Sequence, residues 1–210
     1  MDLNQQTAYW DRVAGTKEFT HPVNLDLLRR FMTPDVRILD YGCGYGRVCR
    51  LLADGGYKNI EGWDISEAMI ARGRRLFPDL NLKVLPAHPE GSFDGVLLAA
   101  VLTCIPSDAG QTALIETVGA LLKPGGLVYI SDYLLQEDER NVERYRANQA
   151  KFGTYGVFRL PEGAILRHHS LDWLKHLLSA FESLDWTFPE VVTMNGHRAN
   201  AFQFLGRKTG

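Results

Sequence analysis

The stretch of sequence that decides the fold is ILDYGCGYGRV, residues 38–48, in which a short apolar run ends in an acid and three glycines follow at alternate positions. Residues 36–42 have the composition of a short buried strand, and residues 47–55 carry apolar side chains at helical spacing. A glycine turn between a first strand and its helix is the general nucleotide site of open α/β sheets. The turn alone does not identify the ligand.

Strands and helices alternate beyond this turn. The next strands are predicted at residues 59–66, at 82–86, from Phe93 onward and at 127–135. Between them lie a helix capped by Ser66 and a helix that ends at a Lys-Pro-Gly-Gly sequence. This alternation predicts a doubly wound parallel sheet with helices on both faces.

The chain is predicted to form a single domain, residues 1–210, with four parts. They are a helical cap at 1–33, the alternating core at 36–135, a lid-like insertion at 136–170, and a C-terminal helix with an antiparallel strand pair at 171–210. The C-terminal helix begins after Ser170, and its apolar face is expected to extend to Phe181. Asn195-Gly196 predicts the turn of the closing strand pair.

Composition excludes several classes of protein. The chain has 210 residues, is 45% hydrophobic and 23% charged, and has a net charge of −2, with no block of like charge. Nothing in it suggests a nucleic acid or a membrane as partner. The N-terminus lacks the pattern of a signal peptide, and the longest apolar run is too short to cross a bilayer. The three cysteines show no metal or disulfide spacing, so we expect a cytoplasmic protein without a metal.

Two acids narrow the choice of ligand. Asp64 ends the second strand, 20 residues beyond Gly44 (64 − 44 = 20), where an acid commonly accepts hydrogen bonds from ribose hydroxyls. Asp40 would repel a pyrophosphate and attract an ammonium group. A dinucleotide turn also needs a glycine at position 47, which is Arg47 here. A ligand with a ribose, a positive charge and no phosphate is therefore expected, and S-adenosylmethionine meets these conditions.

Four stretches resemble the class I S-adenosylmethionine-dependent methyltransferases. LDYGCGYG is similar to the first motif of that family and GWDIS to the second. GSFDGVLLAAVLTCIP and LLKPGGLVYIS are similar to its fourth and fifth strand segments. The resemblance covers about residues 36–132 in order, together with the closing strand pair. It implies a Rossmann-like seven-stranded sheet with the last strand antiparallel, and an enzyme that releases S-adenosylhomocysteine.

The resemblance also implies roles on the cofactor side. Asp40 would hold the methionine ammonium group, and Asp64 the ribose diol. The remaining cofactor-binding candidates are Gly42, Cys43 and Gly44 in the turn, Ile65 and Ala87 around the adenine, and Ala99 and Ala100 beside the methionine. One position departs from the family, since Pro86 stands where an acid often meets the adenine amino group. The backbone, His88 or water must make that contact.

The methyl acceptor is expected to be a small molecule that receives the methyl group on an O, N or S atom. Because a sulfonium is an activated leaving group, alignment can suffice and no fixed catalytic motif is required. His168 and His169 precede the Ser170 helix and are the candidates for a general base. The candidates for acceptor binding are Tyr9, His21, Thr103, Tyr133 and Tyr155.

Three classes of function stay open on the sequence alone. The alternatives to a methyltransferase are an NAD(P)-dependent oxidoreductase and a non-catalytic protein that binds an adenosyl ligand. An adenine-modifying enzyme is disfavoured, because AAVLTC stands where that branch carries an Asn/Asp-Pro-Pro-aromatic motif. The sequence specifies neither the identity of the acceptor nor the oligomeric state.

Overall fold

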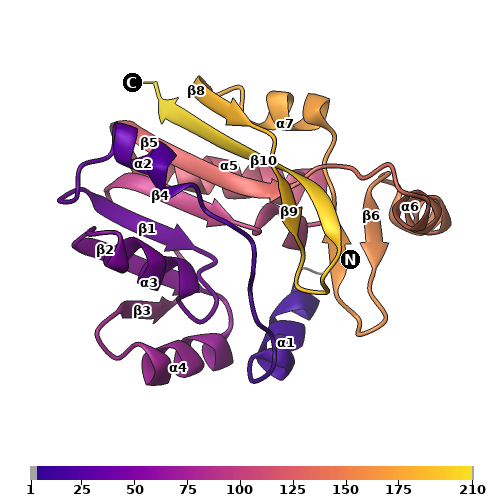
Figure 1. Ribbon diagram of the computed structural model, residues 1–210, viewed down its shortest axis with the longest axis horizontal. Helices are drawn as coiled ribbons and strands as arrows, with labels where there is room; N and C mark the ends of the chain where they lie inside the picture. Colours follow the sequence, from indigo (N-terminus) through magenta and orange to yellow (C-terminus); the bar gives the residue numbers. More distant parts are fainter. Residues whose placement is uncertain (1–3, 210) are drawn as a thin grey trace.

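The computed structural model describes residues 4–209 and contains an eight-stranded sheet. Seven of its strands follow the order β3-β2-β1-β4-β5-β10-β8, and β9 pairs with β10 off this path. The first five of these strands are parallel, and β10 runs antiparallel to both β5 and β8. The predicted fold class, a doubly wound sheet with its last strand antiparallel, is confirmed (Figure 1).

The strands have the following bounds: β1 Arg37–Tyr41, β2 Asn59–Asp64, β3 Asn81–Val84, β4 Phe93–Ala99, β5 Leu122–Tyr133, β8 Phe181–Thr187, β9 Glu190–Val192 and β10 Arg198–Lys208. A separate two-stranded hairpin consists of β6 Val157–Arg159 and β7 Ile165–Arg167.

The helices are α1 Asn4–Val13, α2 Leu25–Phe31, α3 Arg47–Asp54, α4 Glu67–Leu76, α5 Asp108–Leu121, α6 Glu139–Phe152 and α7 Leu171–Leu177, with a 3-10 turn η1 at Leu102–Cys104. Side chains cap several helices by accepting the backbone N–H three residues on, and these caps are Asn24, Ser66, Ser107, Asp138 and Ser170. Such caps explain why the helices begin where they do.

The central strands are buried on both faces, and alternate residues point to different helices. Leu39 packs with residues of α5 and α7, whereas its neighbour Ile38 packs with residues of α2 and α3. Tyr129 of β5 joins the second cluster, and Val128 and Ile130 join the first. This period-two exchange gives the near-continuous apolar strands typical of a covered parallel sheet.

Two elements differ from the sequence prediction. Residues 14–24 are not helical, because the chain leaves α1 at Val13 and crosses the glycine turn before α2 begins at Leu25. The predicted cap at 1–33 is therefore two separate helices, and its first three residues lie outside the described residues. The other difference is β8, which begins at Phe181, where the prediction continued a helix. This outermost strand of the path is half exposed, so it lacks an apolar signal of its own.

The chain segment after β5 builds a separate end of the molecule. Figure 1 shows α6 and the hairpin strand β6 lying together, beyond the end of β5. Backbone contacts fasten this segment to the sheet, since the N–H of Leu135 donates to the carbonyl of His169 at 2.8 Å and the N–H of His169 to the carbonyl of Tyr133 at 3.1 Å. The segment predicted as a lid-like insertion thus lies against the carboxyl end of β5.

Gly73 in α4 tests how closely that helix packs on the glycine turn. A Cβ at this position would lie 2.7 Å from the carbonyl oxygen of Tyr45, a backbone atom that cannot move aside cheaply. Gly73→Ala is expected to lower the free energy of unfolding by about 1–3 kcal/mol, because the clash exceeds the gain in helix propensity. Chemical denaturation measures the change.

Gly119 in α5 supplies the matched control, because a Cβ there would meet nothing within 4 Å. Gly119→Ala is expected to raise the free energy of unfolding by about 0.5–1 kcal/mol, the helix-propensity gain alone. Equal effects of the two substitutions would contradict the close packing of α4 on the turn.

Candidate functional site

A cavity of about 460 Å³ lies over the carboxyl ends of the parallel strands. Its lining comes from the glycine turn, the ends of β2, β4 and β5, and one side of α5. Helices α1 and α6, the β6–β7 hairpin and the turn between β9 and β10 also contribute. A volume of this size is typical of small-molecule sites, and its place is the usual ligand edge of an open α/β sheet.

The glycine turn forms one wall of the cavity. The N–H groups of Gly42 and Cys43 both donate to the carbonyl of Trp63, at 2.7 and 3.0 Å. Gly42 and Gly44 have φ angles of +75° and +56°, in the left-handed region that favours glycine. A Cβ at Gly44 would lie 2.3 Å from the Phe19 ring, so this glycine is required for the close approach of that ring.

Asp64 connects the turn to the next helix. One carboxylate oxygen accepts the N–H of Gly44 and the other the N–H of Ser66, both at 2.8 Å. Burial raises the pKa of this carboxyl, and the two backbone hydrogen bonds oppose that rise. Each carboxylate oxygen retains acceptor capacity, and Asp64 lines the cavity.

Asp40 is a buried acid, with 1% of its surface exposed. Burial raises the pKa of Asp40 to about 7, against a hydrogen bond from the Cys49 thiol and the nearby Arg47 cation. The thiol lies 3.4 Å from Oδ2, and no ion pair involves Asp40 among residues 4–209. A cationic ligand in the cavity would favour the ionised form of this carboxyl.

The end of β4 is strained where it meets the cavity. Ala100 has a φ angle of +56°, the only non-glycine residue with a positive φ in the described part of the chain. Its N–H donates to the carbonyl of Ser131 at 2.8 Å, which holds the unusual turn. Ala99 and Ala100 both line the cavity, and strain of this kind is concentrated at functional sites.

The structure brings together almost all of the predicted cofactor residues. Those that line the cavity are Asp40, Gly42, Cys43, Gly44, Asp64, Ile65, Ala99 and Ala100. Ile65 is 41% exposed, available to pack on a ligand ring. Ala87 does not line the cavity, because Pro86 leads the chain into an irregular exposed loop, and Leu85 takes that place.

The predicted acceptor residues divide in the same way. Tyr9, His21, Thr103 and Tyr133 line the cavity. Tyr155 does not, because it is 38% exposed and packs edge-on against Tyr145, with ring centroids 5.2 Å apart.

His21 is oriented by a chain of hydrogen bonds. Its Nε2 lies 2.9 Å from Oγ of Ser131, and that hydroxyl donates to the carbonyl of Pro22 at 3.1 Å. Because the Ser131 hydroxyl donates its proton to the Pro22 carbonyl, its oxygen is left to accept a hydrogen bond from Nε2–H of His21. Nδ1 is then an unprotonated acceptor, buried and without a hydrogen-bond partner in the protein. Burial and the Arg47 cation lower the pKa of His21 to about 3.

His168 lines the cavity in a different state. Its Nδ1 lies 2.5 Å from the hydroxyl of Tyr145, which also accepts the N–H of Gln136 at 3.2 Å. The phenol proton is thus available to Nδ1, which assigns the ring proton to Nε2. Burial, and secondly the Arg144 cation, hold the pKa of His168 well below its usual value. In this tautomer Nε2 of His168 is a hydrogen-bond donor, and the role of His168 as a general base stays a prediction.

Several lining residues were not identified from the sequence. They are Phe19, Arg47, Arg140, Asn141, Arg144 and the turn residues Thr193, Met194, Asn195 and His197. Phe19 stacks on Tyr45 at 5.3 Å between centroids, which keeps the irregular segment after α1 over the turn. The sequence singles out Arg47 only because a dinucleotide turn needs glycine at this position. In the structure its guanidinium donates to the carbonyl of His21. Long-range contacts of this kind leave no periodic signal.

The model of a family described as a methyltransferase domain matches residues 16–187. This match covers the glycine turn, both acids and the segment that closes the cavity. The chain belongs to that methyltransferase domain family. Its fold and its motifs are those of the class I S-adenosylmethionine-dependent methyltransferases.

Curated relatives are more distant and longer than the matched region. A ubiquinone biosynthesis O-methyltransferase of Xanthomonas campestris pv. campestris is 29% identical over 135 residues, which are 59% of this chain and 55% of the relative. A 2-methyl-6-phytyl-1,4-hydroquinone methyltransferase of Synechocystis sp. is 30% identical over 118 residues, 53% of this chain and 36% of the relative. The chain thus spans about half or less of the length of these curated relatives.

Solved structures share the whole architecture. A SAM-dependent methyltransferase from Methanosarcina mazei superposes with a TM-score of 0.81 and 25% identity, covering 87% of this chain and 97% of the neighbour. A 1,6-didemethyltoxoflavin-N1-methyltransferase of Burkholderia thailandensis, solved with its substrate and S-adenosylhomocysteine, gives a TM-score of 0.62 at 18% identity. It covers 100% of this chain and 82% of the neighbour, a likeness of fold.

Two further observations concern the described part of the chain. Among residues 4–209, no helix combines the length and the apolar character that crossing a membrane requires. Within the same residues, no group of three or more His, Cys, Asp or Glu side chains is placed to hold a metal ion.

His169 does not line the cavity, although the sequence analysis named it as a candidate general base. Its Nδ1 lies 2.9 Å from the carbonyl of Tyr133, and its Nε2 lies 2.8 Å from Nε2 of Gln111. Both ring nitrogens are therefore used inside the protein. Burial lowers the pKa of His169 to about 3, despite its bond to the Tyr133 carbonyl. His169 is consequently a structural residue.

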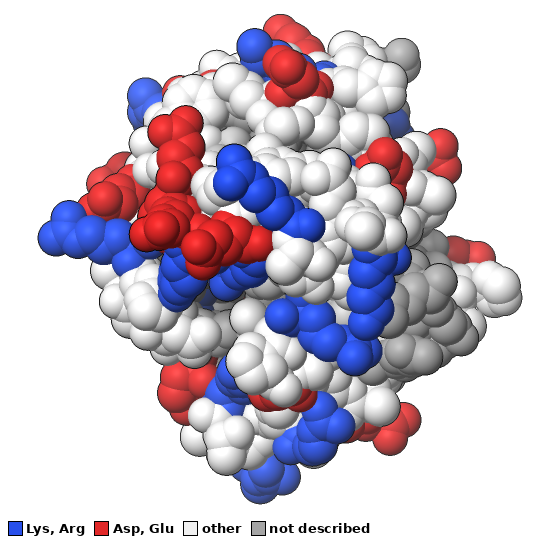
Figure 2. All heavy atoms as spheres, turned by 90° about the vertical axis from the view of Figure 1, so that its right-hand side faces the viewer, with Lys and Arg blue, Asp and Glu red and all other residues white. Residues whose placement is uncertain are grey.

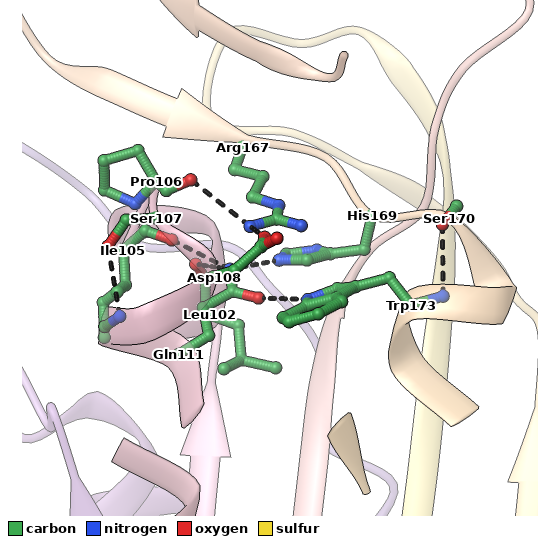
Figure 3. A network of polar contacts seen from close by, with 11 residues as sticks. Leu102, Ile105, Pro106, Ser107, Asp108, Gln111, Arg167, His169, Ser170 and Trp173 are labelled. Atoms are coloured by element: carbon green, nitrogen blue, oxygen red, sulfur yellow. Dashed lines mark hydrogen bonds and ion pairs between the residues drawn. The ribbon is translucent and has the colours of Figure 1, made fainter. Parts of the chain in front are cut away.

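Gln111 is the centre of the network that holds this histidine. Figure 3 shows Trp173 and His169 pointing toward Gln111, and Arg167 reaching Asp108. Oε1 of Gln111 accepts the indole N–H of Trp173 at 2.6 Å, and Nε2 donates to the carbonyl of Ile105 at 2.8 Å. The network ties α5, the loop after β4, the hairpin and α7 together beside the cavity.

The substitution Gln111→Leu tests this network. The residue is 0% exposed, and leucine would leave the Trp173 indole and the His169 ring without their buried partners. The free energy of unfolding is expected to fall by at least about 2 kcal/mol, the cost of buried polar groups without partners. Chemical denaturation measures this loss.

The exposed Gln149 of α6 offers the same substitution as a control. Gln149→Leu is expected to change the free energy of unfolding by less than about 0.5 kcal/mol. A Gln111→Leu protein as stable as the Gln149→Leu protein would show that the network contributes no stability.

Proposed function

We propose that this protein transfers the methyl group of S-adenosylmethionine to a small-molecule acceptor through an O, N or S atom. The observation that carries the proposal is a pair of acids at one wall of the cavity, the buried Asp40 without an ion pair among the described residues and the half-buried Asp64 with free acceptor capacity. A sulfonium and ammonium ligand with a ribose meets both demands. The buried, unprotonated Nδ1 of His21 lines the same cavity.

The cofactor is proposed to lie along the carboxyl ends of β1, β2 and β4. Asp40 would bind the methionine ammonium group, and Asp64 the ribose hydroxyls by charge-assisted hydrogen bonds. Ile65 and Leu85, which line the cavity near the end of β2, would pack on the adenine. The backbone of Ala99 and Ala100 would pass beside the methionine. This pose uses the predicted cofactor residues except Ala87.

Cys43 is proposed to contribute only its backbone and its small volume. Its Sγ lies 3.5 Å from the carbonyl of Gly44, within the protein. The hydrogen bond from Cys49 lowers the pKa of this thiol, but burial and the two neighbouring carboxylates raise the pKa by more. A thiol held neutral in this way is a poor nucleophile.

His21 is the proposed proton acceptor. In the transfer the bond between the methyl carbon and sulfur breaks as a bond to the acceptor atom forms, and the proton of that atom passes to Nδ1 of His21. A hydroxyl oxygen of the acceptor becomes strongly acidic as it attacks the methyl carbon and gains positive charge. A base with a pKa of about 3 is therefore sufficient for an O–H acceptor. The Ser131 hydroxyl keeps the ring in the required tautomer.

Two observations favour a small acceptor over a nucleic acid. The face that carries α6 and the β6–β7 hairpin shows acidic and basic side chains interspersed, without one continuous basic surface (Figure 2). The cavity is lined by aromatic rings, including Tyr9, Trp10, Tyr133 and Phe158. Flat rings suit a planar acceptor, and the two curated relatives are named for ubiquinone biosynthesis and for a hydroquinone. Oxygen is the first acceptor atom to test.

Calorimetry distinguishes this function from its alternatives. S-adenosylmethionine and S-adenosylhomocysteine are expected to bind with micromolar or lower dissociation constants, and NAD not to bind. Binding of NAD alone would establish the oxidoreductase alternative. Adenosyl binding without methyl transfer to any member of a panel of phenols, amines and thiols would favour the non-catalytic alternative.

The pKa of Asp40 predicts how cofactor affinity depends on pH. A carboxyl with a pKa of about 7 is mostly neutral at pH 5.5 and mostly ionised at pH 7.5. Because only the ionised form attracts an ammonium group, the dissociation constant for S-adenosylhomocysteine is expected to fall on the order of tenfold between these pH values. Calorimetry at pH 5.5, 6.5 and 7.5 measures it.

The control for this titration is Asp40→Asn, which keeps the shape and removes the charge. This variant is expected to bind S-adenosylhomocysteine more weakly at pH 7.5, with a dissociation constant that no longer depends on pH over this range. An unchanged pH profile in the variant would assign the dependence to another group, such as the buried Asp132, whose pKa burial also raises to about 7.

The role of His21 is tested by His21→Gln, in which the amide nitrogen can still donate to Ser131. The turnover number is expected to fall by about 10²–10⁴, the usual contribution of a general base, whereas affinity for S-adenosylhomocysteine changes little. Since the pKa of His21 is about 3, its own protonation should not lower turnover between pH 7.5 and pH 5.5.

His176 is the matched control, since it is exposed on α7 and does not line the cavity. His176→Gln is expected to leave the turnover number within about twofold of the parent, an effect typical of surface residues. Full turnover in His21→Gln would remove His21 from proton transfer and leave alignment as the source of the rate.

A further inference from the structure

Helix α6 brings three polar side chains to the cavity on one surface, Arg140, Asn141 and Arg144. Figure 1 shows α6 on the opposite side of the molecule from α3, the helix that follows the glycine turn. The cavity is therefore bounded by acids at the turn and by guanidinium groups at α6. The cofactor residues proposed above make no use of this second group of side chains.

Arg144 is a half-buried cation without a partner of opposite charge. Its guanidinium carbon lies 3.6 Å from the centroid of the Phe158 ring, which also lines the cavity. Its Nε is buried and has no hydrogen-bond partner in the protein. No carboxylate of residues 4–209 lies within ion-pair distance of it. Burial lowers the pKa of Arg144, and Arg140 adds to this effect, whereas Tyr145 and Asp138 oppose it only in part.

Asn141 provides an independent sign of a ligand. It is only 1% exposed and lines the cavity, and its Nδ2 donates to Asp138. Its Oδ1 is buried without a partner. A buried amide oxygen with no hydrogen bond is costly, so a ligand that donates to it would recover that cost.

The other charged groups nearby are already paired or used. Asp138 caps α6, accepting the backbone N–H of Asn141 at 3.2 Å, and Arg140 lies 3.8 Å from it. Lys17 is bound to Glu162 at 3.1 Å. Asp138 attracts Arg144 without forming an ion pair with it, and among the described residues the guanidinium of Arg144 has no carboxylate within ion-pair distance.

We propose that Arg144, with Arg140 and Asn141, forms the subsite for an anionic group of the methyl acceptor, a carboxylate or a phosphate, beside which a hydroxyl or N–H donates to Oδ1 of Asn141. This subsite rests on the proposed methyltransferase function. The cation of the cofactor is held at the acidic wall and the anion of the acceptor at the basic wall. Opposite charges at the two ends orient the acceptor, so that its nucleophilic atom faces the methyl group between them.

Aromatic probes with matched shapes test the subsite. Benzoate and phenyl phosphate carry the two candidate anions, and benzamide is the neutral match. Each is titrated into protein saturated with S-adenosylhomocysteine, by calorimetry. At least one anionic probe is expected to bind tenfold or more tightly than benzamide, and the better of the two identifies the anion. Equal binding of all three, or no binding of either anion, overturns the subsite.

Variants of α6 locate the effect. Arg144→Gln is expected to abolish the preference for the anionic probe, and Arg144→Lys to retain part of it because lysine keeps the charge but not the fork of donors. Arg146→Gln is the control, since Arg146 is exposed on the same helix and does not line the cavity. It should leave the preference intact. Melting curves show whether each variant is folded.

The same titrations separate failure of the subsite from failure of the function. Absence of S-adenosylhomocysteine binding by the parent protein would reject the methyltransferase function itself. Normal cofactor binding without any preference for the anions would reject the subsite alone. A tenfold loss of S-adenosylhomocysteine affinity in a folded Arg144→Gln protein would assign the arginine to the cofactor carboxylate, which also overturns the proposal.

Discussion

The carboxylate of Asp64 fixes the relation between two neighbouring strand ends, and the rest of the site depends on it. Its two oxygens accept the N–H of Gly44, in the turn after β1, and the N–H of Ser66, at the start of α4. The Trp63 carbonyl, one residue earlier, accepts the N–H groups of Gly42 and Cys43. The shape of the turn is therefore set by β2 as much as by its own glycines. A ligand that binds Asp64 meets a carboxylate already oriented by two backbone donors, so little ordering is required on binding.

The two walls of the cavity come from different parts of the fold. The acidic wall belongs to the parallel core, where Asp40 and Asp64 end neighbouring strands. The opposite wall comes from chain outside that core, namely α1, the segment after it, α6 and the hairpin. Gln111 and His169 fasten the hairpin to α5 and to β5 through buried hydrogen bonds. Such a division lets the cofactor wall stay constant while the added segments determine the acceptor, as is usual for loops on a rigid sheet.

The sequence predicted the core well because its signals are local. The run at 38–48 contains strand, turn, acid and helix start within one short stretch, and each has a distinct composition. The acceptor wall was predicted poorly because its contacts are remote in sequence. His168 and His169 are adjacent in the chain, yet one faces the cavity and the other is used inside the protein, as alternation along an extended backbone requires. Arg144 carries no distinguishing signal in the sequence, and only the fold places it over Phe158.

Buried polar atoms without partners show where this protein is built for binding and not for stability. Among the described residues nine buried side-chain atoms lack a hydrogen bond, and six of them belong to residues that line the cavity. The six residues are His21, Arg47, Trp63, Thr103, Asn141 and Arg144. Each such group costs on the order of 1–3 kcal/mol while it stays unpaired. A ligand that supplies partners recovers this cost, whereas a ligand that lacks them leaves it in place. The unpaired groups can thus discriminate one acceptor from another, because only an acceptor with matching polar groups supplies their partners.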